Sequence, residues 1–189
     1  MKKINKNWLF LINIFVSQTV VQASDDVKQF ESYDQIISKH SFVNGKGVCR
    51  AFGIKLYEAK LLSEYPIKKK NPFGQNLLLE LQYFKSFKGQ RIAKRSLKEI
   101  KQLGISNPNQ HKIWLDWMLI NFPDVQKSDL LSGLYLPNKG IIMFVNKKKI
   151  AFNTDVAFAE SFLSIWLYQH TTETELRNDL LENLSLIQI

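Results

Sequence analysis

Residues Val43 to Leu62 read VNGKGVCRAFGIKLYEAKLL and carry the clearest fold signal of this chain. Asn44-Gly45 is the strongest short hairpin signal in the sequence, because Asn and Gly readily adopt the positive φ angles of a tight turn. We therefore predict a hairpin there. It would join a first strand within residues 34–43 to a long second strand from about Gly47 to Leu62.

A single arginine stands in the apolar row of this second strand. Side chains alternate across a strand, so an unbulged strand would place Val48, Arg50, Phe52, Ile54 and Leu56 on one face. A buried charge is costly unless it is paired or binds something. Three roles for Arg50 fit: its guanidinium grips a carboxylate or enolate in an apolar cleft, pairs with an internal acid, or reaches water at a strand end.

The rest of the chain alternates between strand and helix patterns. The predicted elements are a strand over 77–84, a helix over 89–103 closed by Gly104, a helix from Pro108 to Pro123, strands over 130–136, 140–145 and 149–152, a helix capped by Asp155 and running to about Tyr168, and a last helix with a capping box at Thr172–Glu175. The order is three strands, two helices, three strands, two helices. Short turns between successive strands predict an α+β fold, an open-faced antiparallel sheet covered on one face by helices.

The N-terminus has the pattern of a secretory signal. Three lysines precede an apolar run over residues 8–16, and Val21-Gln22-Ala23 is a cleavage site of the A-x-A type. The run is short for a transmembrane span. We predict a signal peptide over 1–23, a single domain over 24–189 without a transmembrane segment, and a periplasmic or secreted protein. An uncleaved membrane anchor is the alternative.

Composition narrows the function classes further. The 189 residues carry a net charge of +9, with lysine runs at 68–70 and 147–149. Both runs adjoin turn residues, which indicates solvated loop tips, and no nucleic-acid-binding motif accompanies them. Cys49 is the single cysteine, so no intramolecular disulfide forms and a buried apolar role is expected.

The motifs of common enzyme classes do not occur in the sequence. Three histidines, His40, His111 and His170, lack the paired spacing of zinc ligands, and no nucleophile elbow, phosphate loop or dinucleotide fingerprint is found. We therefore expect no metal and no cofactor.

Four short motifs together resemble the chalcone isomerase-like family of exported bacterial proteins. They occupy residues 45–50, 55–61, 122–125 (Phe-Pro-Asp-Val) and 165–167 (Ile-Trp-Leu). The resemblance covers about residues 40–182 and implies an open-faced β-sandwich with a ligand cleft. Gly45-x-Gly47-x-x-Arg50 resembles the family's motif at the start of a long strand. By that resemblance Arg50 lies in the cleft. Its counterpart stabilises negative charge in the plant enzymes and holds the ligand carboxylate in fatty-acid-binding relatives.

The function expected from these observations is binding rather than catalysis. The remaining polar groups of the plant enzymes have no counterpart that the sequence identifies, although Tyr83 on the third strand is a candidate hydroxyl. We predict a small amphipathic or aromatic ligand, such as a fatty acid, held by Arg50, Phe52, Ile54 and Tyr83. Tyr57 would face away from Arg50 and serve packing. The alternatives are an intramolecular lyase or isomerase of enone-type molecules with Arg50 catalytic, and a structural envelope module.

Overall fold

The computed structural model describes residues 32–68 and 71–181 of the chain. The chain falls into two compact units, residues 1–37 and 38–189. The described part of the first unit is residues 32–37, at the start of helix α2 (Tyr33–Lys39). The predicted signal peptide over residues 1–23 lies outside the described residues.

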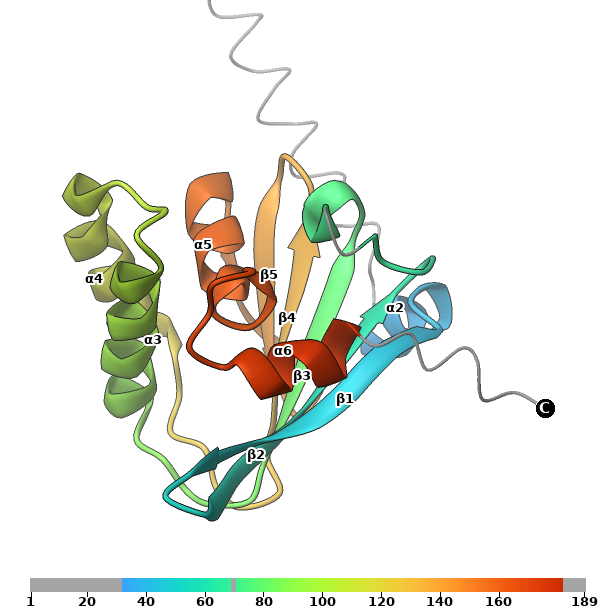
Figure 1. Ribbon diagram of the computed structural model, residues 1–189, viewed down its shortest axis with the longest axis horizontal. Helices are drawn as coiled ribbons and strands as arrows, with labels where there is room; N and C mark the ends of the chain where they lie inside the picture. The colour runs from blue at the N-terminus through green and yellow to red at the C-terminus, as the bar shows by residue number, and fades with distance from the viewer. Residues whose placement is uncertain (1–31, 69–70, 182–189) are drawn as a thin grey trace, which may run out of the picture. The chain divides into compact units, whose positions relative to one another are not determined.

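Six antiparallel strands form one sheet in the order in which they occur along the chain (Figure 1). The strands are β1 (Phe42–Ala51), β2 (Ile54–Ser63), β3 (Leu77–Tyr83), β4 (Leu130–Leu136), β5 (Gly140–Val145) and β6 (Lys148–Asn153). The predicted antiparallel open sheet is confirmed.

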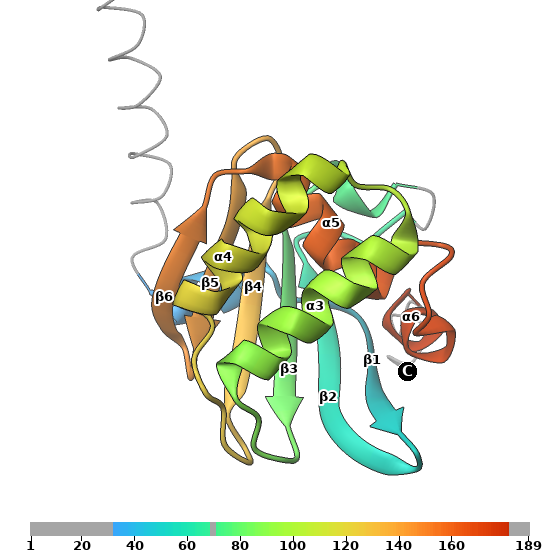
Figure 2. The same ribbon diagram turned by 90° about the vertical axis from the view of Figure 1, so that its left-hand side faces the viewer.

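Four helices cover one face of this sheet (Figures 1 and 2). They are α3 (Gly89–Leu103), α4 (His111–Asn121), α5 (Val156–Leu167) and α6 (Thr174–Leu181), with short 3-10 helices η1 (Pro72–Gly74) and η2 (Pro108–Gln110). Helix α5 packs on β5, α6 packs on β1 and β2, and α3 packs on α4 and α5. The predicted fold class is confirmed. Within the described residues, no helix is both long enough and apolar enough to cross a membrane.

The start of the sheet differs from the prediction. Residues 33–39 form a helix rather than a strand, and β1 runs straight through Asn44-Gly45, with a bulge between Val43 and Gly45. The Asn44 amide is buried; it donates to Ser63 Oγ at 2.7 Å and accepts from the Ile67 backbone N–H at 2.9 Å. Tertiary hydrogen bonds thus outweigh the local hairpin preference of Asn-Gly.

The two glycines of the Gly-x-Gly motif allow α6 to lie close to β1. A Cβ atom on Gly45 would lie 1.9 Å from the backbone oxygen of Asp179, and one on Gly47 would lie 2.4 Å from the Asp179 carboxylate. The motif is therefore needed for packing of a helix against the strand that carries Cys49 and Arg50.

The hairpin turn lies at Phe52-Gly53, between paired residues Ala51 and Ile54. The φ angles of Phe52 and Gly53 are 51° and 77°, the left-handed pair that a tight hairpin turn requires. The predicted single strand from Gly47 to Leu62 is wrong: it is two strands, β1 and β2. A further register shift between Cys49 and Arg50 also breaks the alternation that we assumed.

The Phe-Pro-Asp-Val motif fixes the start of α3. Asp124 Oδ1 accepts the Gly89 backbone N–H at 2.9 Å, and Oδ2 lies 2.7 Å from Lys88 Nζ. Phe87 and Val125 exchange two backbone hydrogen bonds of 2.9 Å. Because the first turn of α3 is held in this way, the side chains of that helix have a fixed position over the sheet.

Candidate functional site

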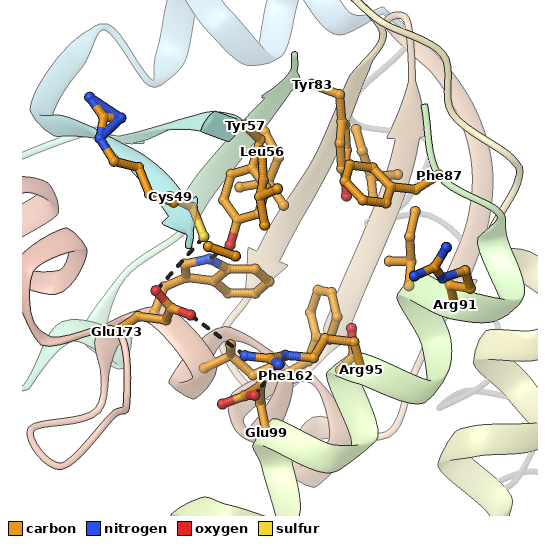
Figure 3. A pocket seen from close by; sticks show the side chains of 18 residues that line it. Cys49, Leu56, Tyr57, Tyr83, Phe87, Arg91, Arg95, Glu99, Phe162 and Glu173 are labelled. Carbon is orange, nitrogen blue, oxygen red and sulfur yellow. Dashed lines mark hydrogen bonds and ion pairs between the residues drawn. The ribbon is translucent and has the colours of Figure 1, made fainter. Parts of the chain in front are cut away.

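A cavity of about 280 Å³ lies between the sheet and α3 and α5. Its floor comes from β1 to β4 and its walls from α3, α5 and the connection before α6 (Figure 3). The lining residues are Cys49, Arg50, Ala51, Leu56, Tyr57, Leu81, Tyr83, Phe87, Arg91, Ile92, Arg95, Ser96, Glu99, Leu131, Phe162, Ile165, Trp166 and Glu173.

Apolar and charged groups are segregated in this lining. Leu81, Leu131 and Phe162 are buried and form the deep part with their aliphatic and aromatic surfaces. The exposed members of the lining include three arginines, Arg50 on β1 and Arg91 and Arg95 on α3. The cavity therefore has a water-excluding interior and a positively charged rim.

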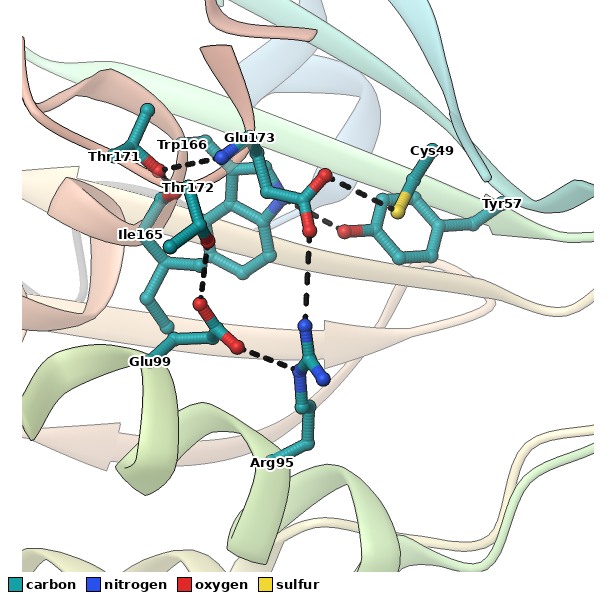
Figure 4. Close-up of polar contacts among 9 residues, drawn as sticks. All are labelled: Cys49, Tyr57, Arg95, Glu99, Ile165, Trp166, Thr171, Thr172 and Glu173. Carbon is teal, nitrogen blue, oxygen red and sulfur yellow. Dashed lines mark hydrogen bonds and ion pairs between the residues drawn. The ribbon is translucent and has the colours of Figure 1, made fainter. Parts of the chain in front are cut away.

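A polar wall crosses the cavity from β1 and β2 to α5 and the connection before α6. Its residues are Cys49, Tyr57, Trp166 and Glu173. The Trp166 indole N–H donates to the Tyr57 hydroxyl at 3.0 Å, and Cys49 Sγ lies 3.8 Å from Glu173 Oε2 (Figure 4). Trp166 belongs to the Ile-Trp-Leu motif, so that motif contributes to the cavity as well as to the core. Tyr57 lines the cavity, contrary to the prediction that it would face away.

Arg95 joins α3 to the connection that precedes α6. Its Nε lies 2.7 Å from Glu99 Oε1, and its Nη2 lies 3.9 Å from Glu173 Oε1. Thr172 Oγ1 donates to Glu99 Oε2 at 2.7 Å, so the hydroxyl that we predicted as a helix cap holds Glu99 instead, and α6 begins at Thr174 (Figure 4). The cluster of Arg95, Glu99 and Glu173 carries two carboxylates for one guanidinium.

Burial controls the ionisation of the polar wall. Desolvation, reinforced by the negative charge of Glu99, raises the pKa of Glu173, although Arg95 opposes the shift. Desolvation also raises the pKa of Cys49 to about 11 and that of Tyr57 well above its usual value. The thiol and the phenol are therefore neutral at pH 7, and Glu173 holds its proton more tightly than an ordinary glutamate does.

Two of the rim arginines have no acidic partner among the residues that the structure describes. Neither Arg50 nor Arg91 forms an ion pair with any residue that the structure describes, whereas Arg95 forms two. Of the three roles considered for Arg50, an internal ion pair is absent among those residues. Arg50 is exposed near the end of β1 and also lines the cavity.

The structure brings two of the four predicted ligand residues together. Arg50 and Tyr83 both line the cavity. Tyr83 is buried, which raises the pKa of its hydroxyl, and that hydroxyl has no hydrogen bond to a described residue. Phe52 and Ile54 are exposed at the hairpin turn and are not among the lining residues, because the chain turns where the prediction continued the strand.

Sequence reasoning missed the contribution of α3. Arg91, Arg95 and Glu99 are spaced four residues apart and so lie on one helix face, which lines the cavity. The i, i+4 spacing was the available signal. Among the described residues, no group of three or more His, Cys, Asp or Glu side chains is arranged to hold a metal ion.

The chain belongs to the chalcone isomerase-like family, which residues 25–182 match. An uncharacterized protein of Haemophilus influenzae is 30% identical over 126 residues, 67% of this chain, and the match spans 60% of that relative's length. A crystal structure of a fatty-acid binding protein of Arabidopsis thaliana shares the fold, with a TM-score of 0.58 and 8% sequence identity over 75% of this chain and 86% of that one.

Proposed function

We propose that this chalcone isomerase-like protein binds a fatty acid or a similar amphipathic carboxylate without catalysis, with Arg50 at the head group. One observation carries the proposal: an apolar cavity has arginines at its rim, Arg50 and Arg91, that no described carboxylate neutralises. A guanidinium matches a carboxylate through two parallel, charge-assisted hydrogen bonds. An apolar tail gains free energy by leaving water for the interior.

The cavity suggests a direction for the tail. Its volume of about 280 Å³ is at the lower end for small-molecule sites. A void of about 10 Å³, lined by Leu79, Gly133 and Met143 among others, adjoins it through the shared residues Leu81, Leu131 and Phe162. Small movements of these side chains would extend the cavity towards the middle of the sheet, and each methylene buried there adds about 0.8 kcal/mol.

Arg95 is a poorer head-group site than Arg50. Glu99 and Glu173 already occupy the Arg95 guanidinium, so a third carboxylate would meet two like charges. At Arg50 and Arg91 the incoming charge meets cations that no described carboxylate pairs with. The likeness of the fold to a fatty-acid binding protein also supports a ligand of this class.

Equilibrium binding of palmitate, followed by displacement of a fluorescent fatty acid, tests the proposal. Replacing Arg50 by Gln should weaken binding about tenfold, the effect of losing one charge-assisted contact. Leu81→Trp, which fills the cavity, should weaken it further. Lys98→Gln removes the same charge from an exposed position on α3 outside the cavity and is the matched control. Equal palmitate affinity in all four proteins would refute the proposal.

A second candidate, an intramolecular lyase or isomerase acting on an enone-type molecule, is favoured by Glu173. Burial in the cavity raises the pKa of the Glu173 carboxyl, which favours the protonated form that a proton donor requires. Arg50 would then stabilise an enolate-like transition state. Turnover of enones that is abolished in both Arg50→Gln and Glu173→Gln would favour this candidate over binding. A structural module is less well supported, because such a module would have a filled interior beside Arg50.

We also propose that the protein is exported, as the N-terminal sequence predicts. Removal of residues 1–23 would leave a mature chain that begins at Ser24. Intact-mass measurement of the protein recovered from a periplasmic fraction tests this directly. A mass that includes Met1, found in the membrane fraction, would favour the uncleaved anchor.

A further inference from the structure

One end of the sheet carries a dense group of basic residues. Four chain segments meet there: the β1–β2 hairpin (50–55), the β3–α3 connection with the first turn of α3 (84–91), the α4–β4 connection (122–129) and the β5–β6 turn (145–148) (Figures 1 and 2). We call these segments the basic end. Their cationic residues are Arg50, Lys55, Lys85, Lys88, Arg91, Lys127, Lys147 and Lys148.

The basic end contains two acidic residues, Asp124 and Asp129, which do not balance the charge of its lysines and arginines. Asp124 is bound to Lys88 and to the Gly89 N–H, and Asp129 accepts the Asn146 side-chain amide at 2.8 Å. Hydrogen bonding to these partners lowers the pKa of both carboxyl groups. The surface therefore presents a net positive field to any partner that approaches this end.

An aromatic ring projects from the β1–β2 hairpin, at one edge of the basic end. Phe52 is fully exposed at the tip of the hairpin, and its neighbour Ile54 is 50% exposed. Phe52 adopts a φ of 51°, a conformation that favours Asn or Gly and is costly for a bulky residue. Phe52 therefore has neither a favourable turn conformation nor buried contacts. Such a departure from local preference is expected at functional positions.

We propose that the basic end docks on an anionic lipid bilayer, with Phe52 inserted at the interface between head groups and acyl chains. Lysine and arginine next to an anionic membrane each strengthen binding by about fivefold. An exposed aromatic ring gains free energy at the same surface by leaving water. The basic charge and the exposed ring thus favour the same partner, and they occur at the same end of the sheet.

Docking in this orientation would bring the cavity to the membrane. Arg50 and Ala51 of the hairpin, Phe87 of the β3–α3 connection and Arg91 of α3 all line the cavity. An amphipathic ligand could then pass between bilayer and cavity without crossing bulk water. This consequence rests on the proposed function, whereas the docking itself does not.

Vesicle co-sedimentation tests the docking. The protein is purified after export, in its mature form, and is mixed with vesicles of phosphatidylcholine alone or with added phosphatidylglycerol. We expect binding only to the anionic vesicles, weakened by salt. Phe52→Asn should reduce the partition coefficient about tenfold without loss of thermal stability, because Asn suits the turn. Phe52→Trp should retain binding. Ile120→Asn, at an 83% exposed position on α4, is the matched control.

A pair of charge reversals isolates the electrostatic part. The double variant Lys55→Glu with Lys85→Glu should abolish vesicle binding. The double variant Lys94→Glu with Lys98→Glu changes the net charge by the same amount, on the exposed side of α3, and should retain most of the vesicle binding. Three results would overturn the proposal. They are equal vesicle binding by wild type and Phe52→Asn, an equal loss of binding in the two charge-reversal variants, and a wild-type protein that binds heparin but not anionic vesicles. Palmitate affinity is measured without vesicles, so that failure of docking and failure of the cavity are told apart.

Discussion

Arg95 on α3 lies 2.7 Å from Glu99 and 3.9 Å from Glu173, so that one guanidinium links α3 to the connection before α6 at the edge of the cavity. Two carboxylates share this single cation, which leaves the cluster with an excess of negative charge when both are ionised. If the proposed ligand carboxylate entered the cavity, this negative charge would favour Arg50 and Arg91 over Arg95 as its partners. Burial, together with the negative charge of Glu99, raises the pKa of Glu173.

Glu173 should contribute a pH-dependent component to stability. Its pKa is higher in the folded protein than the ordinary value of 4.5, so the folded state binds more protons than the unfolded state. Stability due to this group is therefore present below pH 4.5 and is lost as pH rises through the folded pKa. Urea unfolding from pH 4 to 8 should show Glu173→Gln gaining stability relative to wild type across that window, with a constant difference above it.

Glu175→Gln supplies the control for this series, since Glu175 is an exposed carboxylate close by in the sequence. Its stability difference from wild type should show no matching rise. A Glu173→Gln curve parallel to wild type at every pH would contradict the assigned cause, namely burial next to a second carboxylate.

Cys49 should react slowly with alkylating reagents. Desolvation raises the pKa of its thiol from 9.0 to about 11, so at pH 8 the thiolate fraction is about 100-fold below that of an ordinary cysteine. Iodoacetamide labelling followed by mass spectrometry should show at least that retardation, and full reactivity in urea. Glu173→Gln should accelerate labelling of the folded protein, because a neighbouring negative charge is removed. Labelling of the folded wild type at the free-thiol rate would be inconsistent with this environment.

Gly45→Ala and Gly47→Ala should destabilise the protein severely. The added Cβ atoms would lie 1.9 Å and 2.4 Å from atoms of Asp179, so α6 would have to move off β1, at a cost of about 3 kcal/mol. Gly74→Ala is the matched control, because its nearest neighbour is the Asn71 side chain at 3.2 Å, which can rotate away. Unfolding free energies from urea titrations report the difference. A small effect at Gly45 would mean that α6 does not pack as described.

Asp155 has two roles at the start of α5. Its Oδ1 accepts the Phe158 N–H at 3.0 Å, and its Oδ2 accepts the indole N–H of the buried Trp114 at 2.7 Å. Asp155→Ala should cost about 3 kcal/mol, because it removes a helix cap and leaves a buried donor unpaired. Asp155→Asn retains a capping oxygen and should cost about half as much. Chemical denaturation distinguishes the two, and equal losses would argue against the capping role.

Local signals predicted the second half of the fold well. Strands β4 and β5 have the predicted bounds, Gly104 ends α3 with a φ of 68°, and Asp155 caps α5. In these places a turn residue or capping side chain acts on its own neighbours in the chain. The sequence pattern therefore contained the information that decides the structure.

The first hairpin and much of the cavity depend on distant contacts instead. Asn44 is drawn into the sheet by Ser63 and Ile67, and Gly45 is needed for α6. Neither partner is visible from the local sequence, so the turn was predicted eight residues too early. Cys49 and Glu173 likewise meet only because α6 folds back on β1, which no local pattern reveals.

Mass spectrometry of the small molecules released by denaturing natively purified protein would show whether the cavity holds a ligand. We expect an amphipathic carboxylate such as a fatty acid at close to one molecule per protein, with clearly less in Arg50→Gln and none in Leu81→Trp. A protein that carries no such molecule, or the same amount in wild type and in the cavity-filled Leu81→Trp variant, would contradict the proposed binding function.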